Sequence, residues 1–166
     1  MRTFYLKQKF FKITDNYMIK DDEGNDVYHV KEKFRPIGKN ISITNHETGV
    51  SCTIKQKLFH LFATYTADFS NGQTILIQQK LSFLRPKLEL QLNHTKLTVK
   101  GSIPQYSFSV FHKGHEIAEI KKVVFSFTDQ FRIIVKDDQF QDAIIATVIA
   151  IDAIQDKESR VSASQE

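Results

Sequence analysis

The stretch Phe140-Gln-Asp-Ala-Ile-Ile-Ala-Thr-Val-Ile-Ala-Ile-Asp-Ala-Ile154 is apolar over 15 residues, interrupted only by Gln141, Asp142, Thr147 and Asp152. On a helix these four polar residues point in different directions, and a helix without a continuous polar face is typical of a buried core. A buried strand is the alternative, but the length and the four alanines favour a helix. Because a membrane span needs about 20 apolar residues, the stretch predicts a core helix instead.

Upstream of this stretch, glycines recur between short runs of alternating apolar and polar residues. Gly24-Asn-Asp-Val27-Tyr-His-Val30-Lys31 matches Gly114-His-Glu-Ile117-Ala-Glu-Ile120-Lys121, and a shorter form of the repeat begins at Gly49 and at Gly72. A glycine that follows a polar cluster between two alternating runs is typical of a β-hairpin. Five hairpins are predicted, near residues 17–31, 41–58, 62–83, 87–101 and 106–127.

Two further strands are expected, one at Thr3–Phe11 and one at Phe131–Lys136, which makes about twelve antiparallel strands. A sheet of this length closes more readily than it stays open and flat. A barrel of about twelve strands has an interior too wide for side chains alone, so the apolar helix is expected to fill it. The predicted fold is mainly β: a closed antiparallel barrel of about twelve strands around one C-terminal hydrophobic α-helix.

The composition agrees with one globular domain of 166 residues, with 41% apolar residues, 25% charged residues and a net charge of +4. We expect this single domain over residues 1–156 and a flexible polar tail over 157–166. The mild positive charge fits an anionic partner but is well below that of a dedicated nucleic-acid-binding protein. Cys52 is the single cysteine, which excludes an intramolecular disulfide, and the first residues lack the apolar run of a signal peptide. A cytoplasmic location is therefore expected.

The hairpin Tyr17-Met-Ile-Lys-Asp-Asp-Glu-Gly24-Asn-Asp-Val27-Tyr28-His-Val30-Lys31, combined with the Ile/Ala helix that ends in Asp152-Ala-Ile154, resembles the LURP-one-related family. The resemblance extends from Phe4 to about Ile154. It implies the tubby C-terminal-like fold, a twelve-stranded barrel around a central hydrophobic helix, which the family shares with phospholipid scramblases. Scramblases add a Cys-rich acylated stretch and a C-terminal membrane anchor, and this sequence matches neither. For the simple members of the family the resemblance implies no reaction.

Lysines at corresponding places in four of the predicted repeats are the candidate surface for an anionic partner. They are Lys31, Lys33, Lys55, Lys57, Lys80, Lys121 and Lys122. Outward side chains at these positions would form a band around the barrel and meet anionic lipid headgroups, where each basic residue contributes about 1 kcal/mol. The competing interpretation is that outward lysines only keep the sheet soluble and prevent edge pairing.

Asp152 is a carboxylate among Ile149, Ile151 and Ile154. Burying it unpaired would be costly, so it is expected to reach a barrel mouth or a hydrogen-bonding partner, and it is the candidate polar site at the helix end. Glycine-rich phosphate loops, nucleophile elbows and His-Glu-x-x-His motifs are absent from the sequence. Two histidines, His112 and His115, lie on one predicted turn, and no further ligand is nearby in the sequence except Glu116 and Glu119. No catalytic residue, cofactor or metal site is predicted.

Together these features favour a non-catalytic cytoplasmic binding or scaffold protein that is peripheral at an anionic membrane surface. The expected partner is an anionic phospholipid surface or an unidentified protein, with no nucleic acid and no transmembrane segment, and the oligomeric state stays open. The alternative is an enzyme or a small-molecule binder with a site at a barrel mouth. The filled interior and the missing catalytic cluster argue against this alternative.

Overall fold

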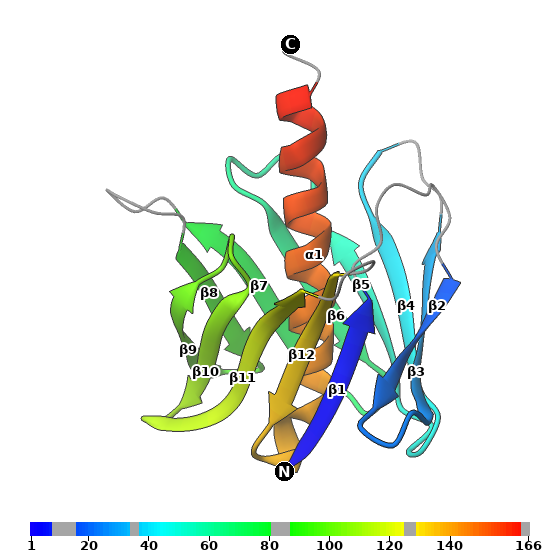
Figure 1. The fold of residues 1–166 in the computed structure, drawn as a ribbon. Helices are drawn as coiled ribbons and strands as arrows, with labels where there is room; N and C mark the ends of the chain where they lie inside the picture. The colour runs from blue at the N-terminus through cyan, green and yellow to red at the C-terminus, as the bar shows by residue number, and fades with distance from the viewer. Residues whose placement is uncertain (8–15, 34–36, 81–86, 125–128, 164–166) are drawn as a thin grey trace.

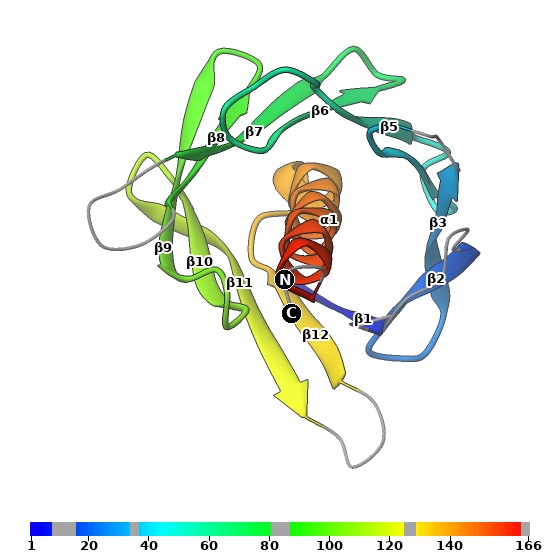
Figure 2. The same cartoon turned by 90° about the horizontal axis from the view of Figure 1, so that it is seen from above.

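The computed structural model of the chain describes residues 1–7, 16–33, 37–80, 87–124 and 129–163. Within these ranges twelve antiparallel strands close into one barrel around one α-helix, which confirms the predicted fold class (Figures 1 and 2). The strands are β1 (Arg2–Lys7), β2 (Asn16–Asp21), β3 (Asp26–Lys33), β4 (Asn40–Asn45), β5 (Ser51–Gln56), β6 (Thr64–Phe69), β7 (Thr74–Lys80), β8 (Lys87–Leu92), β9 (Thr95–Ser102), β10 (Ser107–His112), β11 (His115–Val124) and β12 (Asp129–Val135).

Strands that follow one another in the chain pair around the ring, and β1 closes the ring between β2 and β12. The β1–β12 register runs over the whole of β1, from Arg2 opposite Val135 to Lys7 opposite Gln130. On its other side β1 pairs with β2 only through Phe4 opposite Asp21 and Tyr5 opposite Lys20. The β1–β2 seam is therefore the shortest ladder of the ring within the described residues.

The predicted alternation of apolar and polar residues places one face of each strand inside the barrel. On β5, Cys52 and Ile54 are buried whereas Ser51 and Lys55 are exposed. Successive side chains of a strand point to opposite faces of a sheet, so a period of two separates the core from the solvent. The barrel wall thus supplies an apolar lining that needs a partner at its centre.

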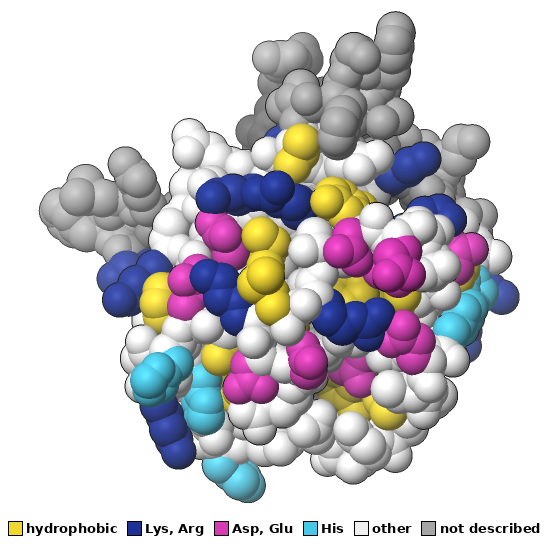
Figure 3. Space-filling model, turned by 60° about the horizontal axis from the view of Figure 1, so that its bottom comes forward, with side chains coloured by type: hydrophobic (Ala, Val, Ile, Leu, Met, Phe, Trp, Pro, Cys, Tyr) yellow, Lys and Arg dark blue, Asp and Glu magenta, His cyan; other side chains and the backbone are white. Residues whose placement is uncertain are grey.

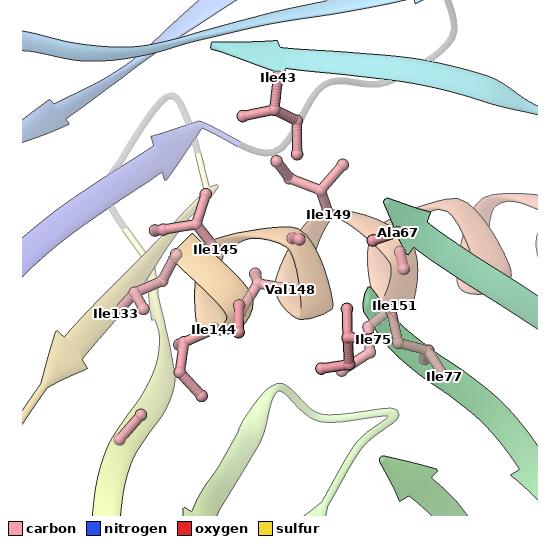
Figure 4. Packing of buried hydrophobic residues seen from close by; sticks show 14 of the residues in the cluster. Ile43, Ala67, Ile75, Ile77, Ile133, Ile144, Ile145, Val148, Ile149 and Ile151 are labelled. Carbon is pink, nitrogen blue, oxygen red and sulfur yellow. The ribbon is translucent and has the colours of Figure 1, made fainter. Parts of the chain in front are cut away.

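The helix α1 (Gln141–Ala163) provides this partner and runs along the barrel axis (Figures 1 and 2). A short 3-10 turn, η1 (Asp138–Phe140), precedes it, and the Asp137 carboxylate caps this turn by accepting a hydrogen bond from the backbone N–H of Gln139 (3.2 Å). Apolar side chains of α1 and of the strands meet around the axis (Figure 4). The η1 residue Phe140 is buried, as are the four alanines of the stretch and six large side chains of α1: Ile144, Ile145, Val148, Ile149, Ile151 and Ile154.

One predicted boundary needs correction. The helix does not end near Ile154 but continues to Ala163, so residues 157–163 of the expected flexible tail have a helical backbone. This part contains no Gly or Pro and several good helix formers, so nothing in it stops the helix. The first strand is described only as far as Lys7, and the rest of the predicted strand to Phe11 lies outside the described residues.

Candidate functional site

The two ends of the barrel carry different side chains. The strands β1, β3, β5, β7, β9 and β11 run in the same direction as α1, so their last residues share the end where α1 finishes, which is uppermost in Figure 1. We call this the upper end and the opposite one the lower end. At the lower end the first residues of α1 contact Tyr28, and at the upper end Gln155 Nε2 donates a hydrogen bond to the carbonyl of Ile103 (2.8 Å).

The candidate lysines lie toward the upper end, because each follows the apolar part of a strand that runs upward. Lys31 and Lys33 lie near the end of β3, Lys55 near the end of β5, and Lys57 directly after it. Lys33 and Lys55 are both in register with Asn40 on β4, one on each side of it. Two strand spacings are about 10 Å, so these lysines are neighbours on the outer face of the barrel.

Lys31, Lys33, Lys55 and Lys57 are exposed, and none of them forms an ion pair with another residue that the structure describes. We call these four residues the lysine group. Neighbouring like charges repel one another, and an anionic surface would relieve that repulsion. The lysine group is therefore the part of the predicted band that the structure brings together.

The other candidate lysines lie elsewhere around the ring. The Nζ atom of Lys80 on β7 lies 3.8 Å from Glu89, and the Nζ atom of Lys121 on β11 lies 2.5 Å from Glu119. Lys122 is exposed and follows on β11, where its backbone N–H donates to the carbonyl of Tyr106 (2.8 Å). Lys80 and Lys121 thus have acidic neighbours, in contrast to the lysine group.

At the lower end acidic side chains compensate the basic ones. Arg2 donates two hydrogen bonds to the Glu47 carboxylate (2.5 and 2.8 Å), and Lys20 lies 2.6 Å from Asp26. Hydrogen bonding with Arg2 holds the pKa of Glu47 below its usual value. Figure 3, which brings this end forward, shows acidic and basic side chains interspersed on the same face. The basic side chains Arg2 and Lys20 at the lower end thus have acidic partners, which the lysine group lacks within the described residues.

Asp152 lies inside the upper end of the barrel, where the Tyr106 hydroxyl donates a hydrogen bond to its carboxyl group (3.0 Å). Burial raises the pKa of Asp152 to about 6, an effect that the Tyr106 hydrogen bond partly opposes. The Tyr106 ring stacks on Phe131 with 3.9 Å between the ring centroids. Asp152 thus has the hydrogen-bonding partner that the sequence required, and this contact ties α1 to the barrel wall.

A second polar cluster at the lower end was not predicted from the sequence. The hydroxyl of Tyr28 donates to Asp142 (2.7 Å) and accepts a hydrogen bond from Gln141 Nε2 (2.7 Å), while Asn45 Nδ2 donates to Asp142 (2.9 Å). Burial and the Asp142 carboxylate raise the pKa of Tyr28 well above its usual value, so the phenol stays a donor. Such a network fixes the rotation and depth of the helix in the barrel. Only the polar Gln141-Asp142 pair before the apolar run hinted at it.

Exposed apolar side chains at the upper end are a second feature that the sequence did not predict. Ile37 belongs to the β3–β4 connection, and Leu58, Phe59 and Leu61 belong to the β5–β6 connection; all four are exposed. The signal is present in Leu58-Phe59-His60-Leu61-Phe62, which is apolar where a connection between strands is normally polar. The alternation of apolar and polar residues in the preceding strand extends to Leu58. The sequence therefore predicts that the strand of the hairpin continues to Leu58, and it does not predict an exposed connection.

The cavity at the upper mouth is small. It is lined by Ile103, Pro104, Ile151, Ile154 and four other residues and holds about 20 Å³, the space of about one water molecule. Sites for small molecules usually measure about 300–1,000 Å³. A wider groove of about 690 Å³ lies on the outer face of the barrel and includes Tyr5, Lys7 and Tyr17. The mouth cavity thus does not favour a small-molecule site at that position.

The residues available for catalysis or metal binding are few. Cys52 is buried inside the barrel, and burial raises the pKa of its thiol to about 12, so the thiolate that would react is scarce. Among the residues of the described ranges, no group of three or more His, Cys, Asp or Glu side chains is placed to hold a metal ion. In the same part of the chain no helix is both long enough and apolar enough to cross a membrane.

Comparisons with known proteins agree with this architecture. The sequence model of the LURP-one-related family matches residues 2–152. The chain is 22% identical over 151 residues to "Uncharacterized protein YxjI" of Bacillus subtilis (strain 168), and the match covers 91% of each chain. The X-ray structure of the Arabidopsis thaliana protein AT5G01750 superposes with a TM-score of 0.56 at 16% sequence identity, covering 90% of this chain and 91% of that one, and so shares the fold. The twelve-stranded barrel, its central helix and the family match over nearly the whole chain lead to one conclusion: the chain belongs to the LURP-one-related family.

Proposed function

We propose that this protein is a non-catalytic cytoplasmic binding or scaffold protein that places the upper end of its barrel on anionic phospholipid surfaces. The observation that carries the proposal is the lysine group, in which Lys31, Lys33, Lys55 and Lys57 are exposed and have no ion-pair partner within the described residues. A scaffold role is supported by the interior, because the helix and the strands fill it with apolar side chains.

Electrostatic attraction is the expected driving force. Each basic residue close to an anionic membrane surface contributes about 1 kcal/mol, and the attraction decays over a Debye length of about 8–10 Å at physiological salt. The lysine group is compact enough for its members to reach one membrane surface together. The placement of the charge matters more for this proposal than the net charge of +4.

Cosedimentation with phosphatidylcholine vesicles, with and without phosphatidylserine, tests the proposal. The full chain is expected to bind the anionic vesicles more strongly, and the binding is expected to fall as salt rises. Exchanging Lys31, Lys33, Lys55 and Lys57 for Gln should weaken binding by about 100-fold or more, because four contributions of about 1 kcal/mol are removed.

The matched control exchanges four other lysines, Lys20, Lys96, Lys113 and Lys136, for Gln, which gives the same change in net charge. Their strands and turns place them toward the lower end, where Lys20 and Lys136 have acidic partners. Binding close to that of the unaltered chain is expected. Equal weakening in both quadruple variants would show that net charge alone attracts the protein. Equal binding of neutral and anionic vesicles would overturn the proposal.

A further inference from the structure

Four large apolar side chains protrude from the upper end of the barrel next to the lysine group. Their exposed fractions are 72% for Ile37, 41% for Leu58, 104% for Phe59 and 90% for Leu61. We call these four residues the apolar tip. Single exposed apolar residues are common on proteins, but several large ones gathered together mark an interaction surface.

The apolar tip is one surface, because the two connections that form it are joined. The backbone N–H of Gln56 donates to the carbonyl of Lys39 (3.0 Å), which holds the end of β5 against the β3–β4 connection. The Leu58 side chain lies so close to Gly38 that a Cβ atom on this glycine would be 3.2 Å from Leu58 Cδ2. Leu58 therefore packs between the two connections while Phe59 and Leu61 point outward.

Phe59 combines full exposure with an unfavourable backbone conformation. Its φ angle is +63°, in the left-handed region that bulky side chains seldom occupy. Burial of the ring would normally offset such strain, but this ring contributes nothing to the core of the folded chain. Backbone strain of this kind gathers at functional positions, and here it holds an aromatic ring in solvent.

The charges around the apolar tip indicate what covers it. Lys55 and Lys57 directly precede Leu58 in the chain, and Lys33 lies across β4 from Lys55. An apolar protrusion bordered by cations that have no ion-pair partner among the described residues matches the interface of an anionic bilayer, where apolar side chains enter the acyl boundary and cations meet the headgroups. A protein groove would instead have to present an apolar floor inside an acidic rim.

We infer that the apolar tip inserts into the acyl boundary of an anionic phospholipid bilayer while the lysine group contacts the headgroups. This inference rests on the proposed function and adds a second, salt-insensitive contribution to binding. It also fixes which side of the molecule meets the membrane: the β3–β4 and β5–β6 connections face the bilayer and the lower end faces away from it. Ile37, Phe59 and Leu61 would enter the bilayer, and Leu58 would brace them.

A tryptophan reporter tests insertion directly, because the chain contains no Trp. Phe59→Trp in the full chain is expected to show a blue-shifted emission with phosphatidylserine-containing vesicles, and brominated acyl chains in the same vesicles should quench it. His94→Trp is the matched control, since His94 is exposed on the β8–β9 turn at the lower end. Its emission should change in neither experiment. An unshifted and unquenched emission from a Phe59→Trp protein that binds the vesicles would overturn insertion.

Removal of the apolar side chains with the lysines intact is the second test. Phe59→Asn combined with Leu61→Ser should weaken binding to the anionic vesicles by about tenfold or more, because two large apolar side chains no longer enter the interface. The remaining binding should become more sensitive to salt. His60→Gln, an exposed polar position in the same connection, should bind like the unaltered chain. Asn tolerates a positive φ, so the double variant should melt no lower than the unaltered chain.

The outcomes separate this inference from the proposed function. The unaltered chain and the double variant could bind the anionic vesicles equally strongly and with the same salt sensitivity. That result would support headgroup contact by the lysine group and exclude insertion of the apolar tip. If the unaltered chain bound anionic and neutral vesicles equally, both the proposed headgroup contact and the insertion of the apolar tip would be excluded. A lipid-free dimer that the double variant converts to a monomer, measured by light scattering, would assign the apolar tip to a second copy of the chain and overturn the inference.

Discussion

Asp152 links the chemistry of one side chain to the stability of the whole barrel. Its carboxyl group lies among isoleucines of α1, receives a hydrogen bond from Tyr106, and has a pKa of about 6 because burial disfavours the charged form. Lys39, Glu32 and Asp156 are the charged groups that act on it most strongly. A carboxyl group with a raised pKa holds its proton more tightly in the folded chain than in the unfolded one. Its contribution to stability is therefore complete at low pH and is lost as pH rises.

Asp152→Asn should remove this pH dependence. In the unaltered chain the contribution is present below pH 3.8, the value of a free Asp, and is lost as pH rises through about 6. Asn still accepts the Tyr106 hydrogen bond and never ionises, so the variant is expected to be more stable at pH 7 by about 2 kcal/mol and similar near pH 4. Melting temperatures between pH 4 and 8 measure the difference. The exposed Asp22→Asn is the control, and parallel pH profiles of the Asp152 variant and the unaltered chain would contradict the prediction.

At the residue scale the sequence predicted the surroundings of buried polar side chains better than the positions of exposed apolar ones. Asp152 was identified because a carboxylate inside an apolar run must find a partner. Phe59 was missed because an apolar residue after a strand is consistent with a longer strand, and only the backbone angle of 63° and the full exposure of the ring show that it leaves the sheet. The Tyr28–Asp142 hydrogen bond joins residues 114 positions apart, and no local pattern predicts such a pair.

At the scale of elements, α1 is the part on which the core depends. The closest contacts of the helix are with β5, β7 and β12 on different sides of the barrel, so one helix completes packing around the ring. Seven large apolar side chains contribute on the order of 10–20 kcal/mol before entropy is subtracted, whereas the net stability of a domain is about 5–15 kcal/mol. No barrel of this width is expected to survive the loss of the helix.

A chain that ends at Asp138 should therefore fail to fold as a soluble monomer, and a chain that ends at Lys157 should unfold cooperatively like the full chain. Ile149→Asp should resemble the shorter chain, because Ile149 is buried and faces Ile43 across the core (Figure 4). Ile149→Val is the matched control and should cost only about 1 kcal/mol. Circular dichroism during thermal unfolding provides the measurement. If the chain that ends at Asp138 unfolded cooperatively at the melting temperature of the full chain, the helix would not be needed for the stability of the barrel.

The helix and the hairpins were predictable because both depend on local periodicity. The apolar run gave the position of α1, and the glycine turns gave the strand count. The predicted end of the helix was wrong because the mostly polar residues from 157 onward were assigned to a tail, although none of residues 157–163 is a helix breaker. Once packing has nucleated a helix, residues with high helix propensity extend it. A change from apolar to polar residues does not by itself end the helix.

At the scale of the whole molecule the barrel is a ring with one short ladder. β1 is paired with β12 over six residues and with β2 over only two within the described part of the chain. The neighbouring pair β11–β12 is matched over seven residues. Within the described residues β1 is thus held mainly by β12, and the β1–β2 seam has the fewest paired residues of the ring.

Hydrogen–deuterium exchange should reveal this asymmetry. Peptides that cover β2 are expected to exchange faster than peptides that cover β11, which pairs with β10 from His115 to Lys121 and with β12 from Ala118 to Val124. Mass spectrometry at several exchange times measures the difference. Anionic vesicles should leave the β2 rate unchanged, because the proposed docking surface involves β3–β6 and their connections. Equal rates in β2 and β11 would contradict the weak seam.

The pairing of β1 with β12 also sets an order of events during translation. The ribosome makes β1 first, but its main partner and the helix that fills the ring are the last described elements to be made. The hairpins in between emerge with apolar faces that have nothing to cover them, a state that invites aggregation and chaperone binding. Folding of this domain is therefore expected to reach completion only after β12 and α1 have been made, when α1 enters the nearly finished ring and β12 joins β1.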